Sequence, residues 1–500
     1  MSLENEQLTP PATILMDDIL GDISDFNNTE SKLYYLGLPS CPFLVARSSF
    51  PTIAWKQRVN YDGETMLKEL RVVGNHPLKE VMWTSIDVVR IGYVGEPFAP
   101  VILWIGVAPY SLSSTDGLTI AHKCKQILDQ NGITDVEVEI RESVVNPSVG
   151  PKPLTTTLGF SIRSEGTGWA EGTSGFFMAE GGNSKIFLIT ARHIIFPRIK
   201  LNNDEYVHEN TSQPHHNVLL LSDCSFRELG ESIKNAVEAT ESMISSQERD
   251  VELFKGKENQ NEFKHAQAEL DKTKRALEQH EMIFHEFYMH WGYSDNRIIG
   301  HVIFSPPVSL GVGVNGFMED FAVIEMDTSK LDANNFLGNV IDLGTLITPE
   351  DFVDMVHPLT LQTTEPLHTP LTVFYTSREM RQPHTLDENG EPCIIVLKRG
   401  LTIGRVNNVA SFTRRYTGGD KHGISKEWPV LPRNNNSGPF SSNGDSGALI
   451  VDGHDRMVSL LTSGAGHRDS LDVAYSTPMV FLLERIAQRF SQAHLKPVLS

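Results

Sequence analysis

The chain has 500 residues, of which 40% are hydrophobic, and its formal net charge at pH 7 is −20. A chain of this length can form about two to four domains, each with its own core. The negative charge argues against nucleic acid and anionic membranes as partners, because neither attracts an acidic surface. No run of apolar residues approaches the length of a membrane-spanning helix, so we expect no membrane partner.

The N-terminal region and the cysteines bear on the compartment. Residues 1–30 are acidic and polar, so we expect a flexible segment, and they lack the basic and apolar regions of a signal peptide. The cysteines stand far apart and form no Cys-x-x-Cys pair: Cys41, Cys124, Cys224 and Cys393. This spacing predicts free thiols and a cytoplasmic or other intracellular reducing compartment.

Residues 31–150 have the pattern of a separate α/β domain. The apolar run 101–107 predicts a buried strand, Ser113 begins a stretch that can cap a helix over 118–130, and residues 136–140 alternate as in a half-exposed strand. This β-α-β unit has no glycine-rich phosphate loop, so we predict no nucleotide site. The domain then serves either for packing or regulation, or for binding a peptide or partner.

A histidine closes the next strong strand pattern. Residues 185–189 are apolar and rich in β-branched side chains, and they lead directly into Thr190-Ala191-Arg192-His193. A lone histidine is usually structural. Its place at the end of an apolar strand makes His193 a candidate for proton transfer.

The composition changes over residues 225–290 to Glu, Lys, Gln, Ala and Ser, with almost no glycine or proline. Apolar residues recur there at spacings of three and four, on both sides of the break at 255–257. This pattern predicts two heptad-like helices that form an antiparallel hairpin. Its apolar stripes either satisfy only each other or make the hairpin a dimerisation or partner-docking arm.

Two further motifs follow in the chain. Asp320 opens the apolar run 321–324, and Ser446 lies between glycines in Gly444-Asp445-Ser446-Gly447. The apolar runs 448–451 and 457–461 predict a β-hairpin directly after the serine. The order is therefore His, Asp, Ser, and these side-chain types together activate a serine hydroxyl for attack on an acyl group.

With these motifs, the chain resembles the chymotrypsin/trypsin-like serine peptidases, of a disulfide-free, intracellular type, over about residues 155–490. The similar stretches are Thr190-Ala191-Arg192-His193, Asp320-Phe321-Ala322-Val323-Ile324 and Asn443-Gly444-Asp445-Ser446-Gly447. The resemblance implies a mainly β double barrel, with the helical hairpin at 225–290 inserted and the α/β domain in front. The first barrel would occupy 151–350, and the second barrel with a C-terminal helix 351–500.

The family also implies roles for single residues. His193, Asp320 and Ser446 would be catalytic, and the amides of Gly444 and Ser446 would form the oxyanion hole. The substrate cleft would be lined by Phe440, Asn443, Thr462, Ser463 and Gly464. Phe440, six residues before the serine, would lie at the base of the pocket, which predicts a small or apolar preference. No cofactor and no metal are required. In many family members, a newly cut N-terminus pairs with the aspartate next to the serine. Because no processing site is evident before Gly159, the partner of Asp445 stays open.

The sequence thus predicts a serine endopeptidase that works through an acyl-enzyme intermediate on a protein or peptide substrate, with self-association through the hairpin as an additional hypothesis. Two rival functions remain. A protease-fold scaffold would bind a protein partner and cut nothing, and an esterase would use the same triad on small acyl esters.

Two histidine patterns invite a metal interpretation. His280-Glu281 and His285 miss the zinc motif His-Glu-x-x-His by one residue, so the second histidine leaves the helix face. His215-His216 has no evident third ligand in the sequence, so we predict an ordinary surface loop there and no metal.

Overall fold

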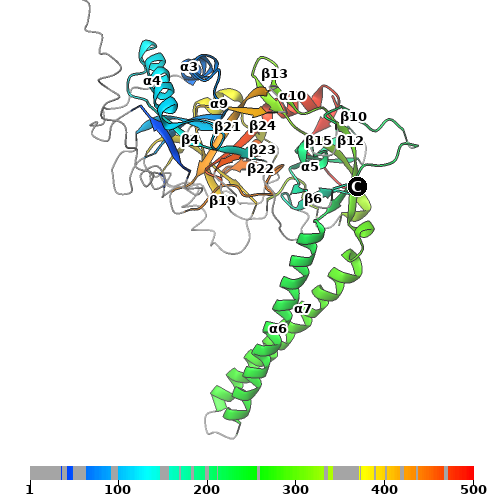
Figure 1. The fold of residues 1–500 in the computed structure, drawn as a ribbon. Helices are drawn as coiled ribbons and strands as arrows, with labels where there is room; N and C mark the ends of the chain where they lie inside the picture. The colour runs from blue at the N-terminus through cyan, green and yellow to red at the C-terminus, as the bar shows by residue number, and fades with distance from the viewer. Residues whose placement is uncertain are drawn as a thin grey trace, which may run out of the picture.

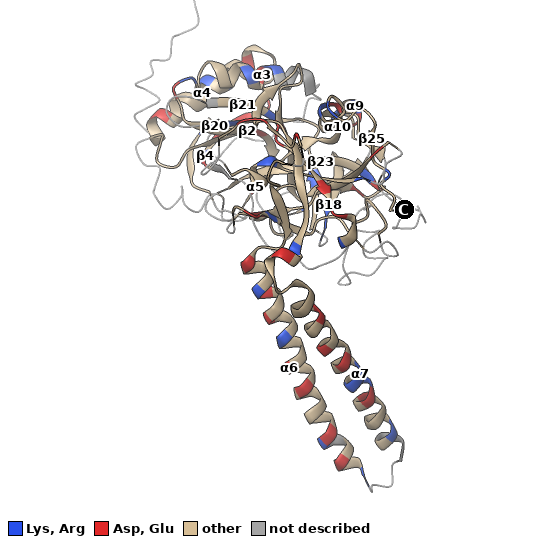
Figure 2. Ribbon diagram, turned by 90° about the vertical axis from the view of Figure 1, so that its right-hand side faces the viewer, with Lys and Arg blue, Asp and Glu red and all other residues tan. Residues whose placement is uncertain are grey.

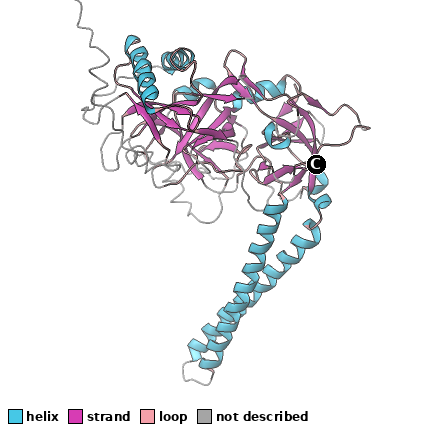
Figure 3. Ribbon diagram, viewed as in Figure 1, coloured by secondary structure: helices cyan, strands magenta, loops and turns pink. Residues whose placement is uncertain are grey.

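The computed structural model describes the following residues: 35, 42–48, 63–91, 100–146, 157–167, 170–181, 185–197, 202–210, 212–255, 260–331, 336–341, 371, 373–383, 385–387, 390–399, 402–416, 422–434, 437–466 and 471–499. The expected flexible segment 1–30 lies outside them. Strands dominate the main body, antiparallel pairs prevail, and two long helices project from it (Figures 1 and 3).

The described N-terminal unit combines five strands with two helices. Helix α4 joins the parallel strands β3 and β4, and the Ser113 side chain caps it by accepting a hydrogen bond from the Asp116 amide at 3.1 Å. The elements are β1 (Leu44–Arg47), α3 (Gly63–Asn75), β2 (Trp83–Arg90), β3 (Val101–Val107), α4 (Ser114–Gln130), β4 (Glu137–Glu142) and β5 (Val144–Asn146). The buried run 101–107 is thus a strand, as its hydrophobicity predicts.

This N-terminal sheet does not end within the unit. Strand β2 pairs antiparallel with β20 (Ser411–Tyr416), which belongs to the C-terminal half of the chain. The same hydrophobic core contains Leu103 and Ile105 of β3 together with Val430 and Val458 from the C-terminal half. The N-terminal unit and the C-terminal half therefore share a sheet and a core.

A second sheet carries the predicted catalytic histidine and aspartate. Its path is β25-β8-β9-β15-β12-β11-β6-β7, and because β7 and β8 are successive in the chain, the sheet curls back on itself. The strands are β6 (Ser161–Ser164), β7 (Glu171–Thr173), β8 (Phe176–Glu180), β9 (Ile186–Thr190), β10 (Tyr206–Val207), β11 (Asn217–Leu220), β12 (Ile298–Ser305), β15 (Ala322–Met326) and β25 (Ala493–His494). Its interior is apolar, with Phe177, Leu188 and Ile324 among its fully buried residues.

Six strands of the C-terminal half form a closed barrel. Pairing runs from β18 through β19, β21, β24, β23 and β22 and returns to β18. These strands are β18 (Pro392–Lys398), β19 (Thr402–Val406), β21 (His422–Pro432), β22 (Leu449–Asp452), β23 (Arg456–Gly466) and β24 (Val473–Pro478). The remaining smaller elements are η1 (Ser294–Arg297), β13 (Ser309–Val312), β14 (Phe317–Glu319), η2 (Thr328–Lys330), β16 (Val373–Phe374), α9 (Ser377–Arg381), β17 (Thr385–Leu386) and α10 (Met479–Ala487).

The projecting helices are α6 (Asp223–Phe254) and α7 (Gln260–Trp291). They contact each other along their length, for example through Thr240 and His280, whose side chains lie 3.1 Å apart, and through the ion pair of Glu248 and Lys274 at 2.7 Å. Both signs of charge alternate along their surface (Figure 2). Each helix thus covers part of the other and presents its charged residues to water.

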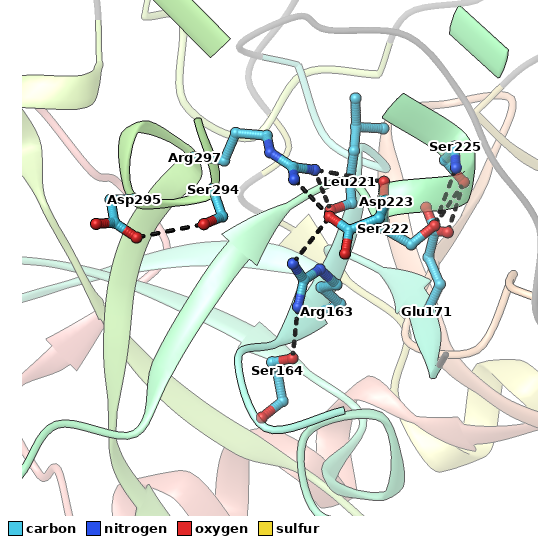
Figure 4. Close-up of polar contacts among 10 residues, drawn as sticks. All are labelled: Arg163, Ser164, Glu171, Leu221, Ser222, Asp223, Ser225, Ser294, Asp295 and Arg297. Atoms are coloured by element: carbon cyan, nitrogen blue, oxygen red, sulfur yellow. Dashed lines mark hydrogen bonds and ion pairs between the residues drawn. The ribbon is translucent and has the colours of Figure 1, made fainter. Parts of the chain in front are cut away.

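Buried arginines hold the base of α6 to the second sheet (Figure 4). Asp223 accepts hydrogen bonds from Arg163 at 3.2 Å and from Arg297 at 2.6 Å, and both arginine side chains are about 5% exposed or less. Ser225 donates to the Glu171 carboxylate of β7 at 2.5 Å. The attachment of the two helices therefore depends on residues at their base, not along their length.

Three of the four cysteines lie within the described residues, and all three are free thiols: Cys124, Cys224 and Cys393. Burial raises the pKa of both Cys124 and Cys393 to about 12, so their reactive thiolate forms are scarce at neutral pH. The fourth, Cys41, lies outside the described residues. No described helix is both long and apolar enough to cross a membrane.

We predict that the long part of the helix pair is separable from the body. Replacing residues 230–285 by a short Gly/Ser linker keeps Asp223, Ser225 and Arg297, and closing such a loop costs little extra entropy. The variant should therefore unfold cooperatively by circular dichroism, with a Tm close to that of the full chain. A matched variant that also carries Arg297→Met should lose stability, because it removes the anchor of Asp223. Loss of folding in the simple deletion would show that the helices are part of the core.

Candidate active site

The fold brings His193 and Asp320 together through neighbouring strands. Thr190 ends β9 and is paired with Ala322 of β15, so the residues just beyond each end lie side by side. The Nδ1 atom of His193 lies 2.7 Å from Oδ2 of Asp320, and the backbone N–H of His193 donates to Oδ1 at 3.1 Å. Asp320 therefore holds both the ring and the backbone of the histidine. With its proton on Nδ1, the ring keeps the lone pair of Nε2 available.

The Asp320 carboxylate is 1% exposed and nevertheless favours the ionised form. Burial alone would raise its pKa, but the charge and hydrogen bonds of His193, with a smaller contribution from Arg415, lower the pKa to about 2. Asp320 is thus a carboxylate throughout the physiological range, as a residue that orients and stabilises an imidazolium must be.

The loop that carries Ser446 depends on glycines. Gly444 and Gly447 have φ of +99° and +87°, a region that favours glycine. A Cβ on Gly447 would lie 2.3 Å from Oγ1 of Thr190 and 2.4 Å from the carbonyl of Thr173, both in the second sheet. The glycine signature in the sequence therefore reflects a close approach of the loop to the strands that lead to His193.

Thr173 of β7 also holds the loop that carries Ser446. Its backbone N–H donates to the Ser446 carbonyl at 2.8 Å, and its hydroxyl donates to the Gly444 carbonyl at 2.5 Å. The hydroxyl of Thr190 in turn donates to the Thr173 carbonyl at 2.8 Å. These bonds orient two carbonyls of the loop, and with them the peptide planes Gly444–Asp445 and Ser446–Gly447.

The hydroxyl of Ser446 does not bond to His193 in this conformation. Ser446 is fully buried, and its Oγ donates to the Thr462 carbonyl at 3.4 Å. The Nε2 atom of His193 is buried and has no hydrogen-bond partner among the described residues. The geometry expected of the three residues is therefore present between Asp320 and His193 and absent between His193 and Ser446.

Asp445, whose contact the sequence leaves open, pairs with Lys398 at the end of β18. Lys398 Nζ lies 3.0 Å from Oδ2 of Asp445, and the two side chains are 4% and 9% exposed. The same oxygen accepts from the backbone N–H and the hydroxyl of Ser442, at 2.8 and 3.2 Å. A small cavity beside the pair is lined by Gly159, Ser161, Thr173, Lys398, Arg399, Asp445 and Ala448. Nothing local in the sequence signals this lysine, which is 47 positions before the aspartate by residue number.

The residues predicted to bind substrate lie next to β19, in the serine loop and on β23. Phe440 is 2% exposed and packs against Gly404 of β19, where a Cβ would come within 2.5 Å of the ring. Asn443 is half-buried in the serine loop. Thr462, Ser463 and Gly464 belong to β23, and Gly464 is paired with Asn146 of β5 as well as with Ala474 of β24. Both edges of β23 are therefore occupied at Gly464.

A second buried carboxylate lies near Asp320 and is not evident from the sequence. Glu427 of β21 is completely buried, and Ser425 donates to it at 2.9 Å. Burial, reinforced by the charge of Asp320 and opposed by Arg415, raises the pKa of Glu427 to about 8. One guanidinium thus acts on two carboxylates, and only Asp320 is fully ionised at neutral pH.

Comparison with known proteins gives little similarity. No protein-family model matches the chain, and no curated protein matches it. Among solved structures it is similar to a protein described as a glutamic acid specific serine protease that utilizes a novel histidine triad in substrate binding. The identity is 11%, the match covers 68% of this chain and 100% of that chain, and the TM-score is 0.31. A TM-score of this size lies below the range that marks a common fold.

We predict that Lys398→Met destabilises the protein by about 3 kcal/mol, because it leaves the buried Asp445 carboxylate without its cation. The double variant Lys398→Met/Asp445→Asn should recover much of this loss, since it removes both charges. Urea unfolding of the two variants and the parent provides the comparison. If the single variant unfolds within about 0.5 kcal/mol of the parent, the pair contributes nothing measurable.

We predict that Glu427 makes stability fall as the pH rises. Its carboxyl has an ordinary pKa of 4.5 when unfolded and a pKa of about 8 when folded, so between these values the folded state binds more protons. The free energy of unfolding must then decrease with pH across this window. Glu427→Gln mimics the protonated acid. Between pH 5 and pH 8, its free energy of unfolding should therefore fall less than that of the parent, by about a few kcal/mol. Parallel urea-unfolding profiles for the two proteins would contradict this role.

Proposed function

We propose that this chain is a serine endopeptidase with a chymotrypsin-like double barrel, into which α6 and α7 are inserted as an arm. The observation that carries the proposal is the pair of hydrogen bonds from His193 to the buried Asp320 carboxylate, next to a glycine-bounded serine loop. A carboxylate that holds Nδ1–H leaves Nε2 as a general base, and Ser446 is the nucleophile within its neighbourhood.

The chemistry would proceed in two acyl-transfer steps. Ser446 rotates from the Thr462 carbonyl toward His193, gives its proton to Nε2 and attacks the scissile carbonyl. The amides of Gly444 and Ser446 stabilise the oxyanion, and the imidazolium then protonates the leaving amine. Water repeats the sequence on the acyl-enzyme, with His193 again as the base.

The ion pair of Lys398 and Asp445 supports an active loop without a newly cut N-terminus. The positive charge next to the aspartate comes from a side chain inside the barrel. Because Asp445 is already paired and accepts from Ser442, the serine loop needs no further cation to hold its conformation. We therefore propose that the enzyme requires no proteolytic activation at this aspartate.

Substrate binding at β23 would require a local rearrangement. A peptide that extends β23 beside Gly464 competes with β5, whose Val144, Val145 and Asn146 are paired with Gly466, Ala465 and Gly464. A protein substrate would therefore displace β5 from this edge. Phe440 at the pocket base would favour a small or apolar side chain before the scissile bond.

One observation favours a second candidate function, a scaffold of the same fold that cuts nothing. Ser446 is fully buried and turned to Thr462, while Nε2 of His193 lacks a hydrogen-bond partner among the described residues. A protein that stays in this conformation would bind partners without catalysis. Several large apolar side chains of α6 and α7 are exposed and offer such a surface, which would also serve self-association: Met243, Leu253, Met282, Ile283 and Met289.

We predict that a serine-directed fluorophosphonate labels Ser446, as mapped by mass spectrometry. Ser446→Ala and His193→Ala should abolish the adduct and lower any peptidase activity by at least about a thousandfold, because the nucleophile and its base act as a unit. Ser437→Ala, on an exposed serine that precedes the same loop, should leave labelling unchanged. Ser446→Ala should also keep the free energy of unfolding within about 1 kcal/mol, since it removes one long hydrogen bond. A parent protein that takes up no label between about pH 6 and 9 would favour the scaffold.

A further inference from the structure

Three histidines meet beside the second sheet, two from the connection between β10 and β11 and one from the distant strand β12. His208 follows β10, His215 precedes β11 by two residues, and His301 lies on β12. The rings of His215 and His301 are stacked, with centroids 4.0 Å apart and planes 5° apart, and His208 meets them edge-on at 5.0 and 5.1 Å. One ring nitrogen from each lies within 4.8 Å of the other two. His208 lies seven residues before His215 in the sequence, and the fold adds His301 from β12.

His208 provides an independent indication of a missing ligand. Its Nδ1 atom is buried and has no hydrogen-bond partner within the part of the chain that the structure describes. Leaving such a nitrogen unsatisfied is costly. Its backbone is held in place, because its N–H donates to the Ile303 carbonyl of β12 at 2.9 Å. Among the described residues, His208 therefore offers an unpaired ring nitrogen and lies against two other imidazole rings.

We propose that His208, His215 and His301 bind a Zn²⁺ ion, with water as the fourth ligand. Three neutral imidazoles and a water complete the tetrahedron that zinc prefers, and imidazole is a better ligand for zinc than for Mg²⁺ or Ca²⁺.

Metal binding requires one ring to turn. A metal lies in the plane of each imidazole that binds it, and two parallel planes 4.0 Å apart share no such position. Zinc–nitrogen bonds of about 2.0–2.1 Å also place the ligand nitrogens about 3.4 Å from each other. In the cluster these nitrogens lie within 4.8 Å of one another, so they would have to move closer. His215 is the exposed member and lies outside the strands, so it can rotate onto the ion while His208 and His301 keep their places.

The surroundings include a carboxylate that can support the site. Glu325 of β15 is paired directly with His301 across the sheet, and its charge favours a protonated His301. A carboxylate beside a metal-bound histidine commonly orients the ring and raises its basicity. Lys185, which lies 2.9 Å from the Glu325 carboxylate, balances part of this charge. The site thus has no large excess of negative charge, and imidazole ligation supplies its affinity.

The proposal is tested on the full-length protein after removal of metal with EDTA and dialysis. Isothermal titration with ZnCl₂ should show one ion per chain, and Co²⁺ should give the visible absorption of tetrahedral cobalt. His208→Ala, His215→Ala and His301→Ala should each weaken Zn²⁺ binding by at least about tenfold, and His265→Ala, an exposed histidine on α7, should leave it unchanged. Because His215 is exposed, its variant should fold normally, which circular dichroism checks.

A second readout separates a specific site from loose binding. Zn²⁺ should raise the Tm of the parent and of His265→Ala but not that of His215→Ala, since an ion that binds only the folded state stabilises it. The proposal is overturned if the parent takes up no Zn²⁺, or if the triple variant lacking His208, His215 and His301 binds it as tightly as the parent. Equal loss of binding in His265→Ala would likewise reject the site.

Discussion

The loop that carries Ser446 takes its shape from a strand of the other sheet, and most features of the site depend on this contact. Thr173 of β7 bonds to the carbonyls of Gly444 and Ser446, and Gly447 lies where any side chain would overlap Thr190. Ser446 can meet His193 only if the closed barrel and the curled sheet keep the relative position that these contacts define. Glu171, two residues before Thr173, also accepts from Ser225 at the start of α6. The base of the projecting helices and the serine loop are thus attached to the same short strand.

Electrostatics in the site follow from one guanidinium between two buried carboxylates. Arg415 acts on both Asp320 and Glu427, and the charge of Asp320 raises the pKa of Glu427. Asp320 has His193 as a hydrogen-bonding partner and stays ionised, whereas Glu427 has hydroxyl donors from Ser425 and Thr477 and favours its neutral form. Both acids are buried, and their different partners therefore assign different protonation states to two groups of similar intrinsic strength. The aspartate is left as the charged partner of the imidazole.

How much could be predicted from sequence depended on whether the signal was local. The run 101–107 and the Ser113 cap mark their elements through neighbouring residues, and Asp320 and His193 lie two and three residues beyond the ends of adjacent strands, His193 in the helical turn α5 (Arg192–Ile195). By contrast, the pairing of β2 with β20 and of Lys398 with Asp445 joins segments without any shared pattern. The three-histidine cluster has the same origin, because register across β10, β11 and β12 brings its members together. Long-range pairing is decided by which faces bury together, and a single stretch of sequence does not contain that information.

The histidine cluster and His193 are connected through Arg192. Its guanidinium donates to the Ser305 carbonyl at the end of β12 and to the Asp204 carbonyl just before β10, at 3.1 and 2.5 Å. These are the two segments that carry His301 and His208. Arg192 directly precedes His193, so the helical turn that carries the His193 ring is tied to the same two segments that an ion at the cluster would join. An ion bound there would restrict their relative motion, and His193 would be held by these segments through Arg192 and by its bonds to Asp320.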